Sequence, residues 1–467
     1  MFSLSARFSS RTISLFSLFV LVALWAASAC SLERQPASNY HARRVALGED
    51  LKGGVAVLFA AEEPQLDFMP YRQDADFYYL TGWNEPGAAL LVIGAEDVSA
   101  SAAAKAKSTK DERRGYREVL FLPTRNLGLE RYTGAKMDAA TPNVIGAAGV
   151  DEVLPMTELP AVLNKLVAAN RRMIHRIWTQ PGATQAKALI PWMATTLGVA
   201  EPTIARDVTT LTQQLRVVKD AGEIELLKKA SDASIAGQRA MMRAAKPGAT
   251  ERGIAGGMMA VWLAAGCERP SYAPIVGSGI NSTTLHYAEN SRTLEDGEIL
   301  LIDAACEFSM YASDITRTVP VNGHFTARQR EIYDVVLGAQ QAAVDAFVAG
   351  RSKINDRDRE DPDSLDNAAY NYINTHGKGP HGEALGKYWL HGLGHMVGID
   401  VHDPADYPAV LKPGMVFTIE PGVYIPEEHL GVRFECVFVV GANGKLIDLT
   451  AALPHTADDV EAAMRAQ

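Results

Sequence analysis

Acidic side chains stand inside apolar runs of this sequence, which limits the folds that can hold them. Asp303 ends the run Glu298-Ile-Leu-Leu-Ile-Asp303, and Asp314 lies in Ser313-Asp-Ile-Thr-Arg-Thr-Val319. A turn near Phe308-Ser309 would fold both runs into a hairpin in which Asp303 and Asp314 face each other, because they are equally far from its centre. Two such carboxylates are costly unless a cation or a proton lies between them. One of them could instead be an exposed hairpin aspartate, but the four apolar residues before Asp303 disfavour that alternative.

Two glutamates repeat this pattern further along the chain. Glu420 follows Val416-Phe-Thr-Ile, and Glu435 lies in Val432-Arg-Phe-Glu-Cys-Val-Phe-Val439. A charged residue inside such a strand requires a partner. An ion pair with Arg433, two residues earlier on the same face, would explain Glu435 alone. It would not explain the two aspartates and a histidine as well.

Three histidines fall within twelve residues, in the segment Trp389-Leu-His-Gly-Leu-Gly-His-Met-Val-Gly-Ile-Asp-Val-His402. His391 and His395 are four residues apart, as on a metal-binding helix, but the glycines and the missing HExxH glutamate disfavour that interpretation. A glycine-rich bend that presents imidazoles to a cavity fits better. One such histidine alone is more often a structural residue, whereas three together favour a site.

These residues amount to four carboxylates and at least one imidazole. Oxygen-rich ligation without thiolate suits manganese, and does not exclude cobalt, zinc or iron. Bridging carboxylates would hold two divalent ions about 3.5 Å apart, an arrangement that makes a shared water nucleophilic near neutral pH. The remaining histidines could bind substrate or move protons. The pattern therefore predicts a dinuclear hydrolase.

The chain of 467 residues is long enough for two or three domains. Strands, among them Val55–Phe59 and Ala88–Ile93, alternate with helices to about Ala205, which indicates an α/β first domain. Residues Thr210–Ala245 are rich in helix formers, and the rest mixes helices with antiparallel strand pairs. We therefore place a domain boundary near residue 206.

The net charge and the N-terminal segment indicate which partners and which cellular compartment to expect. The net charge of -10 disfavours a nucleic-acid partner. Arg7 and Arg11 precede an apolar run that ends in small residues at Ala27-Ser-Ala29, the layout of an export signal; an uncleaved anchor is the alternative. Cys30 stands where a bacterial lipoprotein carries its lipid. We expect an exported protein that is either periplasmic or anchored to the membrane through lipidated Cys30.

These motifs resemble aminopeptidase P of the pita-bread metallopeptidase family, from about Tyr40 to the C-terminus. Both halves of the chain carry the similarity, in Tyr71-Arg-Gln-Asp-Ala-Asp-Phe-Tyr-Tyr-Leu-Thr-Gly82, Ile275-Val-Gly-Ser-Gly279, His286-Tyr287, Glu289-Asn290, the Asp303 and Asp314 hairpin, His391 to Asp403, Thr418-Ile-Glu-Pro-Gly422 and Gly431-Val-Arg-Phe-Glu435. The resemblance implies an α/β N-terminal domain followed by an α+β pita-bread catalytic domain. We thus expect a signal peptide at 1–29, a linker at 30–39, the N-terminal domain at 40–205 and the catalytic domain at 206–467.

The resemblance also implies one metal centre, with two divalent ions, expected to be Mn²⁺, held by Asp303, Asp314, His395, Glu420 and Glu435. Asp303 would bind one ion through both oxygens, and Asp314 and Glu435 would bridge the pair. His395 and Glu420 would bind the other ion, and Glu420 would help to deprotonate the water.

Four further residues are implied to act around the substrate. His286 and His402 would contact the scissile peptide and handle protons. His391 would line a proline pocket, and Arg433 would support Glu435. The implied reaction is hydrolysis of the Xaa-Pro bond at the N-terminus of peptides with proline in second position. Family members are often dimers or tetramers, and Tyr132 is a candidate contact to a neighbouring subunit.

Two departures from the family pattern bear on these expectations. Cys436 follows Glu435, where relatives commonly have an acidic residue. Three buried thiols, at Cys267, Cys306 and Cys436, are the default expectation. Because strand residues alternate between faces, Cys306 and Cys436 both point away from the ligands, and a disulfide between them is the alternative hypothesis.

The second departure is the segment from Asp403 to Pro413, which is short and lacks an arginine that many relatives use to read the far end of short substrates. The absence of this arginine favours longer peptides over dipeptides as substrates. The alternatives are an Xaa-Pro dipeptidase (prolidase), which would share the same ligands, and a metal-free pita-bread binding module, which the full ligand set disfavours. A methionine aminopeptidase would have no place for the long N-terminal domain.

Overall fold

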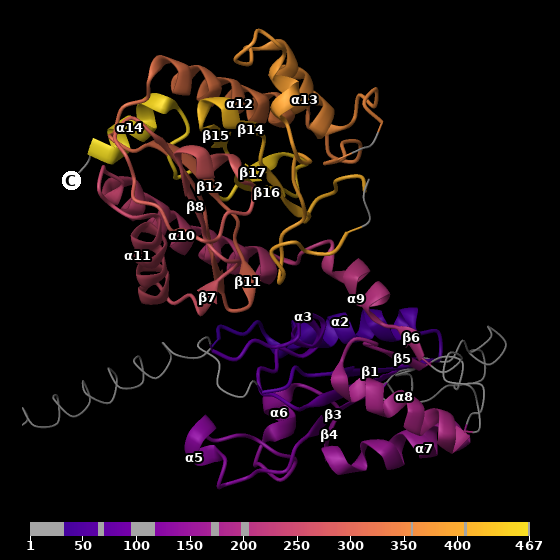
Figure 1. Cartoon of the computed structure of the whole chain (residues 1–467). Coiled ribbons are helices and arrows are strands. Elements are labelled where there is room, and N and C mark those ends of the chain that lie inside the picture. Colours follow the sequence, from indigo (N-terminus) through magenta and orange to yellow (C-terminus); the bar gives the residue numbers. More distant parts are fainter. Residues whose placement is uncertain are drawn as a thin grey trace, which may run out of the picture.

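The computed structural model describes residues 32–63, 70–94, 117–169, 177–197, 205–355, 358–405 and 409–465. It consists of an α/β domain followed by a larger α+β domain (Figure 1). The expected signal peptide at 1–29 and Cys30 lie outside the described residues. Among the residues described, none of the helices is both long and apolar enough to cross a membrane.

A six-stranded mixed sheet forms the first domain, in the strand order β4-β3-β2-β1-β5-β6. Strands β1 and β2 occupy the two apolar runs predicted as strands, and both are buried. The sheet comprises β1 (Val55–Phe59), β2 (Ala89–Ile93), β3 (Arg117–Leu122), β4 (Glu152–Pro155), β5 (Ile177–Thr179) and β6 (Ala205–Asp207). Its helices are α2 (Ala37–Asp50), α3 (Ala75–Thr81), α5 (Glu130–Thr133), α6 (Val144–Ala148), α7 (Leu159–Ala169) and α8 (Thr184–Leu197).

Two helices occupy the stretch from Thr210 to Ala245 that is rich in helix formers. They are α9 (Thr209–Arg216), which connects the domains in Figure 1, and α10 (Ala221–Ala244). The break falls before Asp220, whose side chain accepts the Glu223 N–H while the Glu223 side chain accepts the Asp220 N–H. This capping box starts a new helix and fixes where α10 leaves the connector.

In the described part of the second domain, four small sheets have helices outside them (Figure 1). Helix α12 packs against β14 and β15, and α10 and α11 pack on the side of β7, β8 and β10. The strands are β7 (Arg269–Pro270), β8 (Ile275–Ser278), β9 (Ile299–Asp303), β10 (Cys306–Phe308), β11 (Tyr311–Ala312), β12 (Thr316–Pro320), β13 (Val416–Ile419), β14 (Gly422–Ile425), β15 (Leu430–Arg433), β16 (Cys436–Val440) and β17 (Leu446–Asp448). The helices are α11 (Glu251–Ala264), α12 (Ala327–Ala346), α13 (Leu365–Thr375) and α14 (Ala457–Arg465).

The predicted hairpin exists, but its register differs from the prediction. Asp303 at the end of β9 pairs with Thr316, not with Asp314. Ser309 and Met310 form the turn between β10 and β11, and their φ angles of 50° and 73° suit a tight two-residue turn. This turn lies one residue later than predicted, so each pairing moves by two residues. Because that shift is even, both aspartates keep the same face.

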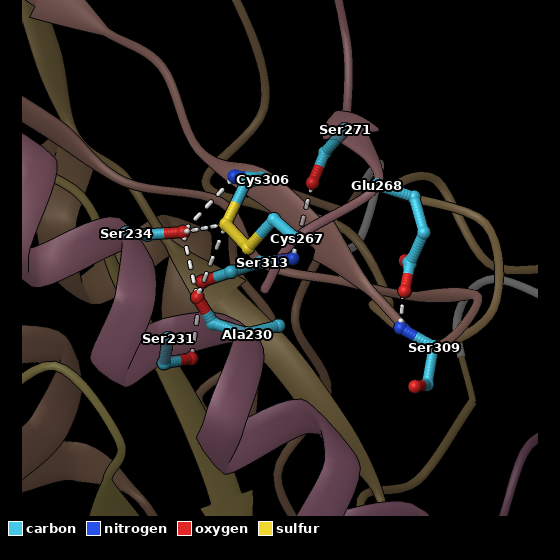
Figure 2. The surroundings of a disulfide bond; sticks show 9 residues. All are labelled: Ala230, Ser231, Ser234, Cys267, Glu268, Ser271, Cys306, Ser309 and Ser313. Carbon is cyan, nitrogen blue, oxygen red and sulfur yellow. Dashed lines mark hydrogen bonds between the residues drawn. A yellow bond between two sulfur atoms is a disulfide. The ribbon is translucent and has the colours of Figure 1, made fainter. Parts of the chain in front are cut away.

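A disulfide joins Cys267, just after α11, to Cys306 in β10 (Figure 2). The hypothesised pairing of Cys306 with Cys436 is therefore wrong, and so is the expectation of three thiols. Cys436 is a buried free thiol whose sulfur accepts an N–H of Arg317 at 3.4 Å. The physical reason is that β7 returns along β10, which brings the two bonded cysteines to a Cα separation of 6.1 Å.

Candidate metal centre

Five side chains predicted as metal ligands meet at one cavity of about 540 Å³ in the second domain, namely Asp303, Asp314, His395, Glu420 and Glu435. Each comes from the end of a strand or from a bend. Asp303 ends β9, and Asp314 lies between β11 and β12. Glu420 follows β13, and Glu435 separates β15 from β16. Asp303 is the last paired residue of its strand, and the other three carboxylates lie just beyond strand ends, so all four converge on the cavity.

The ligand atoms lie close enough to share cations. Within each of three overlapping groups all candidate ligand atoms are within 4.8 Å of one another, the groups being Asp303, Asp314 and Glu435; His395, Glu420 and Glu435; and Asp314, His395 and His402. His395 Nε2 lies 3.2 Å from Asp314 Oδ2 and 3.5 Å from Glu420 Oε1. The groups overlap in Asp314, His395 and Glu435, so an arrangement of two adjacent ions with shared carboxylates fits these residues.

Neighbouring side chains hold the carboxylates from the protein side. Tyr272 donates its hydroxyl to Asp303 Oδ1 at 2.5 Å, and Arg433 Nη2 donates to Asp303 Oδ2 at 2.5 Å. Thr316 Oγ1 donates to Glu435 Oε2 at 2.7 Å and accepts from Arg433 Nε at 3.0 Å. Arg433 thus supports Glu435 through Thr316, whereas its direct ion pair is with Asp303.

The cluster concentrates carboxylates in a buried site, where their charge must be offset by a cation or a proton. Burial, reinforced by the charges of Asp314, Glu420 and Asp303, raises the pKa of the Glu435 carboxyl well above its usual range. Burial raises the pKa of Glu420 to about 7, although His395 and Arg433 lower it. Burial also raises the pKa of Asp303, against the lowering effect of Arg433. Carboxylates that repel one another in a buried site are what bound divalent cations neutralise.

Two histidines of the glycine-rich bend differ in environment. Burial lowers the pKa of His395, but its hydrogen bond to Asp314 and the nearby charges outweigh that and raise the pKa to about 9. Burial, helped by Arg433, lowers the pKa of His391 to about 4. His391 Nδ1 lies 2.8 Å from the Gly392 carbonyl, so a neutral ring donates there and accepts the Tyr424 hydroxyl proton at Nε2, also at 2.8 Å.

The remaining predicted residues line the same cavity. His286 and His402 are at its wall, and the His402 ring centroid is 3.9 Å from that of His395. Tyr424 connects His391 to Arg433, because its oxygen accepts Arg433 Nη1 at 2.8 Å. Tyr272 and Tyr424 were missed by sequence reasoning, since neither tyrosine stands in a pattern that signals its role. Thr316 could have been found, because it follows Asp314 by two residues in the same run.

Comparison with known proteins agrees with this geometry. The family model described as metallopeptidase family M24 matches residues 225–442, and the model of the aminopeptidase P N-terminal domain matches residues 40–175. The Xaa-Pro aminopeptidase of Haemophilus influenzae is 33% identical over 421 residues, which cover 84% of this chain and 88% of that protein. The Xaa-Pro aminopeptidase of Escherichia coli is 32% identical over 457 residues, covering 91% and 97%.

The chain belongs to the aminopeptidase P family of M24 metallopeptidases. The solved structure of proline aminopeptidase P II from Yersinia pestis has 31% sequence identity and a TM-score of 0.77, over 92% of this chain and 99% of that one. The low-pH form of the aminopeptidase P from E. coli has 29% identity and a TM-score of 0.78, with the same coverage. The predicted fold is therefore confirmed for both domains.

Family membership agrees with the donor set of the site. Metallopeptidases of this family use divalent metal ions, and the cluster offers four carboxylates and one imidazole at mutual distances that suit such ions. A carboxylate-rich set without thiolate favours hard or intermediate cations. In this aminopeptidase P family member, Cys436 does not enter the set, because its sulfur contacts Arg317 on the other face of β16.

Proposed function

We propose that this protein is a metal-dependent aminopeptidase that hydrolyses the Xaa-Pro bond at the N-terminus of peptides. The observation that carries the proposal is the convergence of Asp303, Asp314, His395, Glu420 and Glu435 on one cavity, in a chain of the aminopeptidase P family. An open cavity beside the cluster leaves room for a peptide end. Its wall includes three further histidines at which substrate groups can be bound, namely His286, His391 and His402.

The chain's own residues divide the work around that cavity. Two divalent ions, when bound, supply an activated water and polarise the scissile carbonyl. Glu420, whose carboxylate lies at the cavity beside His395, takes up the proton of the attacking water. His402, next to His395, donates a hydrogen bond to the carbonyl oxygen as negative charge develops there. His391, held neutral with Nδ1 bound to the Gly392 carbonyl, keeps its place beside the substrate.

Substrate length is a separate part of the proposal. The segment Asp403 to Pro413 has Lys412 as its sole basic residue and no arginine. A dipeptide has its carboxylate directly beyond the proline, and a bidentate arginine is the side chain best suited to hold it. We therefore propose that peptides of three or more residues are preferred to Xaa-Pro dipeptides.

A substrate panel tests this function. Protein freed of metal and resupplied with Mn²⁺ is offered an Xaa-Pro-Xaa tripeptide, an Xaa-Pro dipeptide and a methionyl peptide without proline in second position. Release of the first residue from the tripeptide alone, or from the tripeptide much faster than from the dipeptide, is the expected result. Cleavage of the dipeptide alone would make the protein a prolidase. No cleavage of any peptide, with no metal bound, would favour the binding-module alternative.

Manganese is the ion we propose for the site. The support is the oxygen-rich donor set, with one imidazole and no thiolate among the five residues. Apparent affinity does not decide the native ion, because Mn²⁺ binds more weakly than Co²⁺ or Zn²⁺ at a given site. Metal analysis of protein purified from its own cell, without added salts, is the test. Zinc in place of manganese at two ions per chain would overturn the choice of ion.

We further propose that the protein is exported and attached to a membrane through lipidated Cys30. The support is the basic, apolar and small-residue pattern before Cys30, together with the Cys267–Cys306 disulfide, which is typical of oxidising compartments. Mass spectrometry of the mature N-terminus tests both parts. We expect the mature chain to begin at a Cys30 that carries a diacylglyceryl group. An unmodified N-terminus near residue 30 would support export but exclude the lipid anchor. An intact Met1 would exclude lipid attachment at Cys30 and would favour the uncleaved anchor instead.

An oligomer is also proposed. The segment around α5 exposes apolar side chains, with Tyr132 88% exposed, Leu127 68% and Leu129 50%. Such a patch on a folded domain is typical of a contact surface. Light scattering coupled to size exclusion is expected to give a dimer or tetramer, and a Tyr132→Glu variant is expected to dissociate. A monomeric wild-type protein at micromolar concentration would contradict the proposal.

A further inference from the structure

A single arginine of the first domain connects two segments that carry the metal centre. Arg72, just before α3, donates from Nε to Glu307 Oε2 in β10 at 2.7 Å. Its Nη2 donates to the Ile399 carbonyl at 2.7 Å and lies 3.3 Å from Asp400 Oδ1. Glu307 belongs to the hairpin between Asp303 and Asp314. Ile399 and Asp400 precede His402, so Arg72 spans the hairpin and the histidine segment at once.

A second set of ion pairs holds the histidine segment from the connector helix. Arg216 at the end of α9 donates to Asp76 Oδ1 of α3 at 2.8 Å and to Asp403 Oδ1 at 2.6 Å. Lys219 Nζ donates to Asp403 Oδ2 at 2.9 Å. Arg216 also reaches Asp400 Oδ2 at 2.6 Å. Both carboxylate oxygens of Asp403 are therefore bound by cations that lie outside the catalytic sheets.

These residues are called the interdomain clasp, which consists of Arg72, Asp76, Arg216, Lys219, Glu307, Asp400 and Asp403. The side chains at its centre are almost inaccessible, with Arg216 4% exposed and Lys219 and Asp403 1% each. The clasp is also continuous with the hairpin through the backbone, because the Ala312 N–H donates to the Gly398 carbonyl at 2.9 Å. Gly398 in turn lies directly against the Asp403 carboxylate.

Stability alone is a poor reason for such an interface. Taking charges out of water costs about as much as their attraction returns, and apolar side chains of similar volume commonly serve as well or better. What buried, multiply hydrogen-bonded ion pairs add is one defined geometry. Asp403 is the residue after His402, whose ring lies 3.9 Å from that of His395. A geometry imposed on Asp403 is therefore imposed on His402 as well.

We propose that the first domain and the connector helix α9 act in catalysis by positioning, with Arg72 and Arg216 setting the place of His402 relative to the Asp303–Asp314 hairpin. Arg72 and Arg216 are positioning residues and touch no substrate. The expected change in kcat rests on the proposed aminopeptidase function, whereas the expected change in the mobility of residues 395–403 does not. A misplacement of about 1 Å at a catalytic group can lower the rate on the order of 100-fold, so small displacements of the clasp should be visible in kcat.

Arg72→Met removes the clasp's link between hairpin and histidine segment, and Arg43→Met is its matched control. Arg43, on α2, is buried and also joins the domains, through Asp220 at 2.7 Å and Glu223 at 3.4 Å. Within the described residues it makes no hydrogen bond to β10 or to residues 398–403. Both variants lose an interdomain arginine, partly buried at position 72 and buried at position 43, so a purely structural role predicts at least as large an effect for Arg43→Met.

Three readouts separate positioning from stability: kcat and KM on an Xaa-Pro tripeptide, bound metal, and amide hydrogen exchange of residues 395–403. For Arg72→Met we expect kcat to fall at least about tenfold, KM to change less than about threefold, two metals to remain bound and exchange to accelerate. For Arg43→Met we expect kcat within about twofold of wild type and unchanged exchange in that segment, despite a lower melting temperature. Arg72→Lys, which keeps the pair with Glu307, should recover part of kcat.

Wild-type kcat and exchange in Arg72→Met would overturn the proposal, as would an equal loss of kcat in Arg43→Met. Should Arg72→Met fail to fold, Arg72→Lys takes its place with the same readouts, and unaltered kcat and exchange in that variant would also overturn it. If the wild-type protein cleaves no Xaa-Pro peptide, the proposed function fails. The exchange comparison still decides the clasp in that case, because it needs no substrate.

Discussion

Arg433 Nη2 lies 2.5 Å from Asp303 Oδ2 in a largely buried ion pair at the metal centre. The same guanidinium donates hydrogen bonds to Thr316 and Tyr424, neither of which is a predicted metal ligand. Asp303 therefore has an orientation before any cation binds. Pre-orientation of this kind lowers the ordering cost of metal binding.

Arg433→Met should destabilise the metal-free protein strongly. Removing one partner of a buried pair leaves the other charge uncompensated, which costs about 3–5 kcal/mol. Urea unfolding after chelation measures the change in the free energy of unfolding. A loss below about 1 kcal/mol, the size expected for an exposed pair, would contradict the role given to Arg433.

Glu420→Gln should fold normally and lose most turnover. The amide cannot accept the proton of the attacking water, and general-base catalysis contributes on the order of 10²–10⁴-fold. Steady-state kinetics on an Xaa-Pro tripeptide, with bound metal measured in parallel, give the result. Turnover close to that of the wild type with metal bound would refute the role of Glu420.

Asp74→Asn should stabilise the protein in a pH-dependent way. Burial raises the pKa of the Asp74 carboxyl from 3.8 to about 6, although its hydrogen bond from the Phe77 N–H lowers it. Since the folded pKa lies above the unfolded one, ionisation costs stability, and this cost grows as pH rises from about 4 to about 6. Asparagine keeps the acceptor for the Phe77 N–H without the charge.

The expected gain of Asp74→Asn in the free energy of unfolding is roughly 3 kcal/mol at pH 7, with little near pH 4. Chemical denaturation of both proteins at the two pH values measures it. A gain of equal size at both pH values would show that the carboxyl charge is not its cause, and a loss at pH 7 would contradict the assigned burial effect.

Chelation should lower the melting temperature reversibly. The four carboxylates around the cavity repel one another in the absence of a cation, and a ligand present at about 100 times its Kd stabilises by about 2.7 kcal/mol. For a domain of this size that corresponds to a fall of about 5 °C or more. Returning Mn²⁺ should restore the original value. A melting curve indifferent to chelator would show that the cluster holds no ion.

Much of the site could be predicted from the sequence, because buried charges are rare enough to identify themselves. Asp303, Asp314, Glu420 and Glu435 each stand in or beside an apolar run of the sequence, and the structure brings all four to the cavity with His395. The α/β first domain likewise followed from strand and helix alternation. The choice of proline came from resemblance, since no spacing of ligands encodes it.

What could not be predicted depends on tertiary pairing. The hairpin register was wrong by two residues, because the turn needed positive φ at Ser309 and Met310, two residues with no glycine to mark them. The disulfide partner of Cys306 was wrong, because nothing in the sequence shows that Cys267 returns beside β10. The prediction for Arg433 named Glu435 but missed Asp303 for the same reason, because Asp303 is 130 residues away in the chain.

Metal titration of the metal-free protein tests the central claim most directly. Mn²⁺ is added stepwise while the release of the first residue from an Xaa-Pro tripeptide and the number of ions bound per chain are both followed. We expect no hydrolysis without metal and full hydrolysis once two ions are bound to each chain. Hydrolysis that persists after complete removal of metal, or none with two ions bound, would contradict it.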